Sequence, residues 1–108
     1  MSERSAEDTT RFAQLVANKQ GWKVNFEDEL TADILSGLQA NHQRYGYFLC
    51  PCRDGSGNRE EDRDIICPCV YAAQDIKEHG HCFCGLFLSE AFFVSGKEAE
   101  SIPERRNQ

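Results

Sequence analysis

The feature that most constrains this chain is its set of six cysteines, which form three pairs with one residue between the two sulfur-bearing positions. The pairs are Cys50-Pro51-Cys52, Cys67-Pro68-Cys69 and Cys82-Phe83-Cys84. Proline fixes its own φ angle and pushes the preceding residue away from the helical region, so each Cys-Pro-Cys presents its sulfurs in defined directions. Residues 1–49 and 85–108 contain no cysteine, so the sulfur chemistry is confined to residues 50–84.

The N-terminal sequence and the net charge bear on where these cysteines function. The segment MSERSAEDTTRFAQLV has no apolar core and carries acids early, so we expect neither a signal peptide nor a transit peptide. No apolar run approaches the roughly 20 residues that span a bilayer, and we expect a cytoplasmic protein. Cysteines in a reducing cytoplasm are more often metal ligands or catalytic groups than structural disulfides. The net charge of −6 argues against nucleic-acid and anionic-membrane partners.

The number of cysteines narrows the kinds of site that they can form. A [4Fe–4S] cluster takes about four cysteine thiolates, and a dithiol–disulfide couple takes the remaining two. Structural zinc sites favour paired C-x-x-C turns, which C-x-C pairs match poorly. The count does not say which two cysteines form the redox couple, since six cysteines allow fifteen different pairs. Two alternatives also stay open: a non-catalytic iron–sulfur electron-transfer or sensor protein, and a structural zinc module for protein–protein contact.

Local patterns predict a small, mainly α-helical α+β fold in a single domain over residues 1–108. Within it, residues 1–49 are expected to form a helical N-terminal half, residues 50–84 the cysteine region and residues 85–108 the C-terminal segment. Helices are predicted over residues 5–20, 32–44 and 68–78, and Thr31 is the expected cap of the second. A turn is predicted at 53–58, followed by a short charged helix. One or two helical turns are predicted within 95–101. Short extended or tightly packed segments are predicted at 22–26 and 85–88.

The order of the cysteine pairs, followed by Gly85-Leu86-Phe87-Leu88, resembles the catalytic (β) subunit of ferredoxin:thioredoxin reductase. The segment RDGSGNREEDRDIICPC is more similar to the prokaryotic ferredoxin:disulfide reductase branch than to the plastid one. The resemblance implies an oxidoreductase folded around a [4Fe–4S] cluster, with ferredoxin as electron donor and a thioredoxin-like protein as disulfide substrate. A small variable subunit or a homodimer is also implied. The implied cluster ligands are Cys50, Cys67, Cys69 and Cys82, and the implied redox disulfide is Cys52–Cys84.

The same resemblance implies different roles for the two cysteines of the disulfide. Cys52 attacks the disulfide of the target protein, while Cys84 lies beside the cluster and resolves the mixed disulfide. A lowered pKa increases the thiolate character on which such an attack depends. Arg53, the immediate neighbour of Cys52, is therefore a candidate to lower the pKa of that thiol.

The chain departs from the plastid pattern at one position near the disulfide. Plastid members of the family carry a histidine between the last two cysteines, where it is thought to assist proton transfer. Here that residue is Phe83, which can neither donate nor accept a proton. His81 and His79 lie just before the third pair and are the candidates to replace it, with His81 expected to be a catalytic residue. The alternative for both is a helix C-terminus, where histidine interacts well with the helix dipole.

Overall fold

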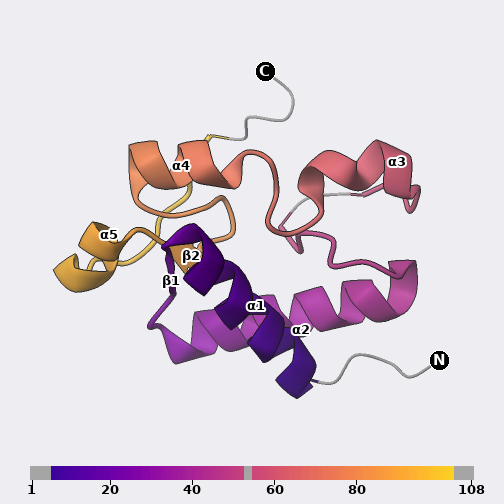
Figure 1. The fold of residues 1–108 in the computed structure, drawn as a ribbon, viewed down its shortest axis with the longest axis horizontal. Helices are drawn as coiled ribbons and strands as arrows, with labels where there is room; N and C mark the ends of the chain where they lie inside the picture. The colour runs from indigo at the N-terminus through magenta and orange to yellow at the C-terminus, as the bar shows by residue number, and fades with distance from the viewer. Residues whose placement is uncertain (1–5, 53–54, 104–108) are drawn as a thin grey trace.

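The structure is a computed structural model that describes residues 6–52 and 55–103, and Figure 1 shows helices arranged around a small two-stranded sheet. The elements in chain order are α1 (Ala6–Gln20), β1 (Lys23–Val24), α2 (Asp28–Tyr45), α3 (Arg59–Asp62), the 3₁₀ turn η1 (Arg63–Ile65), α4 (Ala72–His79), β2 (Phe87–Leu88) and α5 (Glu90–Ser95). The mainly helical α+β class predicted from the sequence is confirmed. No helix in the described part of the chain is long and apolar enough to cross a membrane.

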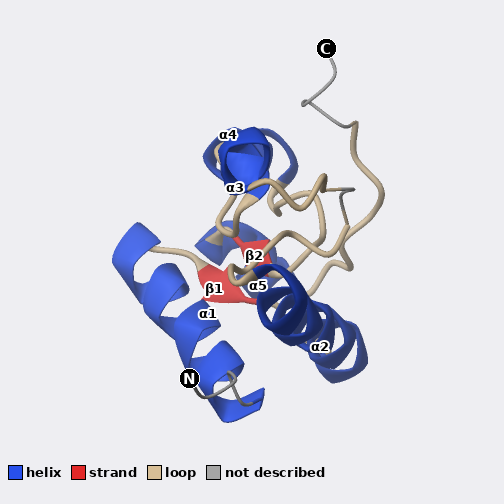
Figure 2. Ribbon diagram, turned by 90° about the vertical axis from the view of Figure 1, so that its right-hand side faces the viewer, coloured by secondary structure: helices blue, strands red, loops and turns tan. Residues whose placement is uncertain are grey.

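The two long N-terminal helices, α1 and α2, contact each other on one side of the sheet, while α3 and α4 lie on the other side (Figure 2). Both long helices contribute buried side chains to the main hydrophobic core: Ala13 and Ala17 from α1, Ile34 and Leu38 from α2. The ring of Phe12 on α1 stacks on that of Phe48, with centroids 4.2 Å apart. Since Phe48 lies two residues before Cys50, this contact holds the start of the cysteine region against α1.

The sheet joins the N-terminal half to the segment that follows the last cysteine pair. Its two strands are antiparallel, with Lys23 opposite Leu88 and Val24 opposite Phe87. Phe87 and Leu88 are buried, and the ring of Trp22 packs on that of Phe87 with centroids 5.5 Å apart. The short extended segments predicted from the sequence are confirmed, and their pairing places the third cysteine pair on the core.

The second long helix begins earlier than predicted. It starts at Asp28, so Thr31 lies inside the helix and is not its cap. The Thr31 hydroxyl donates instead to the backbone oxygen of Asn25, 3.0 Å away. Asp28 and Glu29 occupy the first turn, where acidic side chains interact favourably with the positive end of the helix dipole. This interaction favours the earlier start, and the prediction of Thr31 as the cap was wrong.

The helix predicted from Pro68 begins instead at Ala72. The intervening residues are tied to the preceding turn by hydrogen bonds. The N–H of Val70 donates to the backbone oxygen of Asp64 at 3.0 Å, and the Tyr71 hydroxyl donates to the Asp64 carboxylate at 2.7 Å. These bonds tie Val70 and Tyr71 to the turn η1, and α4 is shorter than its pattern suggested.

The last helix also lies earlier than predicted. Helical turns were expected within residues 95–101, but α5 spans Glu90–Ser95. The Ser89 side chain caps it by accepting a hydrogen bond from the N–H of Phe92 at 3.1 Å. Gly96, with a φ of 73°, ends it. A serine cap and a glycine stop around an apolar run are a local helix signal, and they place the helix before residues 95–101, so that prediction was wrong.

Gly80 ends α4, as predicted, in a left-handed conformation with a φ of +88°, and a Cβ there would collide with the ring of Phe92. Gly46 ends α2 at a φ of +87° with open space around it. The left-handed conformation costs an L-residue about 1–2 kcal/mol, and overpacking adds about 1–3 kcal/mol. We therefore expect Gly80→Ala to lower the thermal midpoint at least about twice as far as Gly46→Ala, which we expect to lower it by roughly 4–8 °C for each kcal/mol of the backbone penalty.

Thermal unfolding followed by circular dichroism measures both midpoints under identical buffer conditions. Gly46→Ala is the matched control, because it carries the backbone penalty without the collision. Equal shifts in the two variants would show that the Phe92 ring moves aside without cost.

Candidate functional site

Backbone pairing brings the first two cysteine pairs together. Leu49 and Ile66, each next to the first cysteine of its pair, form an isolated antiparallel bridge. The N–H of Cys50 donates to the backbone oxygen of Ile65 at 2.9 Å, and the N–H of Cys67 donates back to the first segment at 2.7 Å. The two Cys-Pro-Cys units, 17 residues apart in the sequence, therefore lie side by side.

The third pair lies in a tight turn just before β2. The N–H of Cys82 donates to the backbone oxygen of Phe87 at 3.0 Å, and the N–H of Gly85 donates to that of Cys82 at 2.9 Å. In return, the N–H of Phe87 donates to Cys82 Sγ at 3.4 Å. The turn brings Cys82 Sγ and Cys84 Sγ within 3.8 Å, so both sulfurs of this pair approach the same region.

The three cysteine segments meet around one small hollow, which we call the cysteine hollow. Its lining includes five cysteines together with apolar walls: Cys50, Cys67, Cys69, Cys82 and Cys84, with Pro68, Ala72, Phe83 and Phe87. Cys50, Cys69 and Cys82 are buried, whereas Cys67 and Cys84 are half-buried. Cys52 is exposed and is not part of this lining.

The pKa shifts of Cys67 and Cys82 indicate which sulfurs lie close to each other. The pKa of Cys67 is well above its usual value, because the thiol is buried and because three neighbouring thiolates would repel its charge. Those neighbours are Cys82, Cys50 and Cys69. The pKa of Cys82 falls to about 7, first because of its hydrogen bond with Cys84 and also because N–H groups of the turn point at its sulfur, and these outweigh burial. Cys67 thus lies among three other cysteines of the hollow.

Cys84 connects this group to the exposed cysteine. Its pKa is raised because three neighbouring sulfurs favour the protonated thiol and because burial disfavours the charged thiolate. Those sulfurs belong to Cys50, Cys52 and Cys82. Two of them line the cysteine hollow, and the third is the exposed Cys52. Cys84 is therefore the contact between the hollow and the surface.

The donor set fits an iron–sulfur cluster. Clusters of this kind are held by cysteine thiolates, about four for [4Fe–4S], and hydrogen bonds to the sulfurs tune their potential. The hollow supplies the cysteines, and the N–H of Phe87 supplies such a hydrogen bond. In the described part of the chain, no three His, Cys, Asp or Glu side chains form a group that could hold a metal ion. The cysteines do not converge on one point, as ligands of a single metal ion would; five of them line the cysteine hollow instead.

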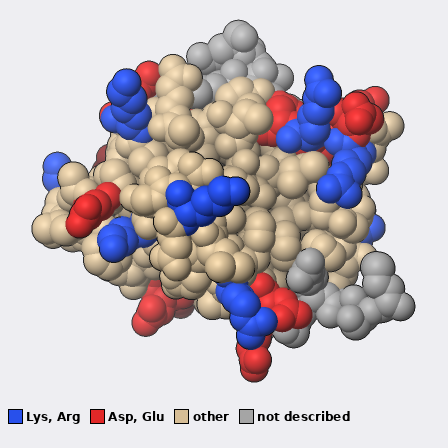
Figure 3. All heavy atoms as spheres, viewed as in Figure 1, with Lys and Arg blue, Asp and Glu red and all other residues tan. Residues whose placement is uncertain are grey.

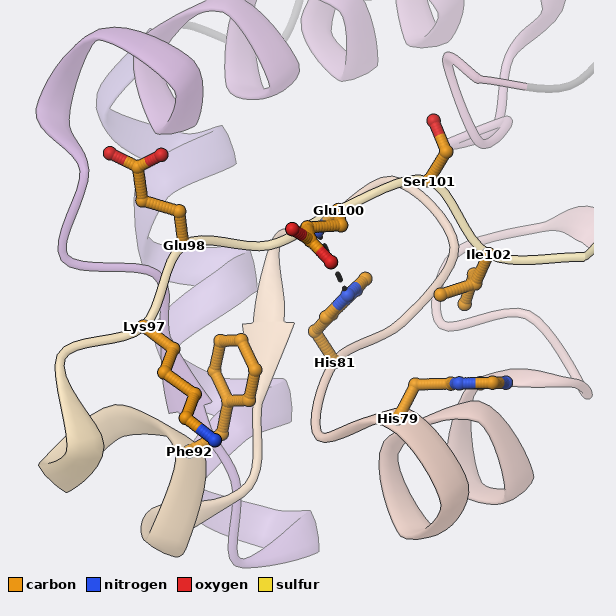
Figure 4. A pocket seen from close by; sticks show the side chains of 8 residues that line it. All are labelled: His79, His81, Phe92, Lys97, Glu98, Glu100, Ser101 and Ile102. Atoms are coloured by element: carbon orange, nitrogen blue, oxygen red, sulfur yellow. Dashed lines mark hydrogen bonds between the residues drawn. The ribbon is translucent and has the colours of Figure 1, made fainter.

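His81 lies beside a neighbouring cavity of about 550 Å³, which Figure 4 shows between α4, α5 and the C-terminal segment. Its imidazole is buried, Nε2 accepts from the N–H of Glu100 at 3.2 Å, and Nδ1 lies 2.7 Å from the backbone oxygen of Cys82. These partners assign the proton to Nδ1, because a carbonyl oxygen only accepts. His81 also lines a smaller hollow with Cys84. Its proton-transfer role stays a prediction, and its hydrogen bonds join the C-terminal segment to the third pair.

Three further residues singled out by the sequence have different positions. His79 ends α4 and lies 3.8 Å from the Glu78 carboxylate, and Figure 4 shows its ring directed away from His81. Phe83 lines the cysteine hollow as an apolar wall. Arg53 lies outside the described residues.

Comparison with known protein families matches residues 1–105 of this chain to the ferredoxin thioredoxin reductase catalytic beta chain family. The chain belongs to this family. The resemblance inferred from the three C-x-C pairs is thereby confirmed, and the match extends well beyond the segment in which those pairs lie.

Curated relatives carry the same family name. The chloroplastic ferredoxin-thioredoxin reductase catalytic chain of Arabidopsis thaliana is 30% identical over 99 residues, covering 90% of this chain and 65% of the relative. The catalytic chain of Pyropia yezoensis is 31% identical over 81 residues, covering 73% and 66%. The cyanobacterial catalytic chain of Synechocystis sp. is 30% identical over 94 residues, covering 85% and 75%. The chain thus spans just under two thirds of the length of the first two relatives.

This member of the reductase catalytic chain family carries both basic and acidic side chains on the face shown in Figure 3, scattered among uncharged residues. Basic and acidic groups lie side by side over α3, where Arg63 Nη1 is 3.8 Å from Glu60 Oε2. Both side chains are largely exposed, and such surface pairs contribute little to stability.

Sequence reasoning missed Asp62, the last residue of α3. It is 1% exposed although it lies in a run of charged residues. Its carboxylate accepts hydrogen bonds from Tyr47, Ser56 and Gly57. The segment REED gives no sign of which acid is buried, because the distinguishing partner, Tyr47, lies fifteen residues earlier.

Proposed function

We propose that this chain is a ferredoxin-dependent disulfide reductase of the cytoplasm, with a thioredoxin-like protein as substrate. In this proposal Cys50, Cys67, Cys69 and Cys82 hold a [4Fe–4S] cluster in the cysteine hollow. Cys52 and Cys84 form the redox disulfide. The observation that carries the proposal is that Cys84 contacts both the exposed Cys52 and sulfurs that line the hollow. Membership of the reductase catalytic chain family supports it.

The chemistry divides between the hollow and the surface. When bound, the cluster supplies single electrons from ferredoxin, and reduction of a disulfide needs two. With two electrons and two protons, the Cys52–Cys84 disulfide becomes a dithiol. The Cys52 thiolate then attacks one sulfur of the target disulfide, which forms a mixed disulfide and releases one target thiol. Cys84 attacks Cys52 Sγ in turn, which re-forms Cys52–Cys84 and releases the second target thiol.

The positions of the two thiols suit these roles. An exposed thiol can reach a disulfide on another protein, and Cys52 is exposed. A resolving thiol has to stay within reach of the attacking one, and the sulfur of Cys52 is close enough to raise the pKa of Cys84. Phe83 and Phe87 form apolar walls of the hollow and limit the access of water to it. A small variable subunit or a homodimer remains the expectation for assembly.

The proposal is tested first by an anaerobic visible absorption spectrum, with iron, sulfide and zinc measured on the same sample. We expect a brown protein with about four irons and about four sulfides per chain. A protein that stays colourless with about one zinc per chain, even after anaerobic cluster reconstitution, contradicts the proposal. A loaded protein in which Cys52 and Cys84 never form a disulfide would instead favour a non-catalytic electron-transfer or sensor protein.

A further inference from the structure

The carboxylate of Asp62 joins the chain on both sides of Cys52. On the N-terminal side, the Tyr47 hydroxyl donates to Asp62 Oδ2 at 2.7 Å. On the C-terminal side, the N–H groups of Ser56 and Gly57 donate to Asp62 Oδ1 and Oδ2 at 2.9 and 3.1 Å. The Ser56 hydroxyl adds a longer contact of 3.3 Å to Oδ1. We call this set of contacts the Asp62 clasp.

The clasp is a buried, charge-assisted network. Asp62 and Tyr47 are 1% and 6% exposed. Burial alone would raise the pKa of Asp62, but hydrogen bonds from Ser56, Tyr47 and Gly57 outweigh it and lower the pKa below its usual value. Burial, and then the bond to Asp62, raises the pKa of Tyr47 to about 12. At neutral pH the clasp therefore consists of an ionised acceptor and neutral donors, a combination that gives strong hydrogen bonds.

Close packing supports the clasp on both sides. A Cβ on Gly55 would collide with the side chain of Leu49, and it would lie 2.8 Å from Asp62 Oδ2. Leu49 is itself held by the bridge to Ile66 and by a 2.8 Å hydrogen bond from Asn41 Nδ2 to its backbone oxygen. Tyr47, before Cys52, and Ser56 and Gly57, after it, are therefore all held against Asp62.

We infer that Asp62 is a positioning residue that holds Cys52 beside Cys84. The inference rests on the proposed function, in which these two cysteines form the redox disulfide. Asp62 touches neither sulfur in this role and acts through the backbone on either side of Cys52. Restricting that backbone raises the effective concentration of one thiol at the other, which favours the intramolecular disulfide.

The expected effect is on the equilibrium between the disulfide and the dithiol. In Asp62→Asn, the neutral amide has one acceptor oxygen and cannot satisfy all the donors of the clasp. We expect the constant for Cys52–Cys84 formation to fall about tenfold, which corresponds to a midpoint about 30 mV less negative. Glu60→Gln is the matched control, because it removes one charge from the same helix at a side chain that is 88% exposed. We expect its midpoint to equal that of the wild type.

The experiment equilibrates iron-loaded protein anaerobically in dithiothreitol redox buffers, then traps free thiols by alkylation and measures them by peptide mass spectrometry. Iron is assayed in every variant, so that a general structural defect is visible. Unchanged iron with a shifted midpoint supports the positioning role. A midpoint of Asp62→Asn equal to that of Glu60→Gln overturns it, even if the wild type reduces disulfides.

A second variant covers the case in which Asp62→Asn fails to load iron. Tyr47→Phe removes one hydrogen bond and leaves the carboxylate with its contacts to Ser56 and Gly57. We expect it to keep its iron and to reduce the constant about threefold, and an unchanged midpoint in this variant then overturns the inference. A wild type that forms no Cys52–Cys84 disulfide at any potential contradicts the proposed function itself, and the positioning role with it.

Discussion

Cys52→Ser is expected to keep its iron and its brown colour and to lose the reduction of a thioredoxin-like disulfide. Cys52 is exposed and lies outside the lining of the cysteine hollow, so its sulfur is not needed to hold a cluster there. A serine hydroxyl matches the thiol in shape but does not form the thiolate that attacks a disulfide. We expect turnover to fall by at least about 10³-fold. The measurement is anaerobic reduction of the target disulfide with reduced ferredoxin as donor.

Cys84→Ser is the informative companion to this variant. Its Cys52 can still attack the target, but the resolving thiol is missing, so the mixed disulfide between the two proteins is expected to accumulate. The mixed disulfide would appear on a non-reducing gel as a covalent complex of the two proteins, and dithiothreitol would separate them by reducing it. If Cys52→Ser lost its iron, the division of the six cysteines into four ligands and a redox pair would be wrong.

Cys69→Ser is expected to lose the cluster and to destabilise the fold. Cys69 is buried in the core, and its backbone oxygen accepts the N–H of Ala72 at the start of α4. A site that holds its group only in the folded state adds the binding free energy to the stability of the fold. We expect iron to fall from about four to less than about one per chain. The thermal midpoint should fall by more than about 10 °C.

Iron assay and thermal unfolding on anaerobically purified samples measure both effects. Cys52→Ser serves as the control, because it makes the same chemical change at an exposed cysteine. A Cys69→Ser protein that retained about four irons would exclude Cys69 from the ligand set and shift attention to Cys84, the remaining cysteine of the hollow.

Local sequence signals predicted most of the secondary structure correctly. Gly46 and Gly80 end α2 and α4 as expected, since both adopt left-handed conformations that glycine tolerates best. The errors lie at the starts of α2 and α4 and in the position of α5, which begins and ends earlier than predicted. Thr31 has the chemistry of a cap, but its hydroxyl donates to the backbone oxygen of Asn25, six residues earlier, and the bonds to Asp64 precede the start of α4. A cap pattern covers only the first turn of a helix, whereas these competing partners lie six or seven residues before the side chains that donate to them.

What the sequence by itself determined is the chemistry available to this protein: six cysteines in three pairs, two of them stiffened by proline, enough for a cluster and a redox couple, together with the family that this pattern identifies. Tertiary structure alone decided which sulfurs line the hollow, that Cys52 stays exposed and that Cys84 touches both groups. It also decided that Asp62, among the acids of α3, is buried against Tyr47. The reason is that burial and sulfur contacts depend on chain pairings such as Leu49 with Ile66, which no local pattern encodes.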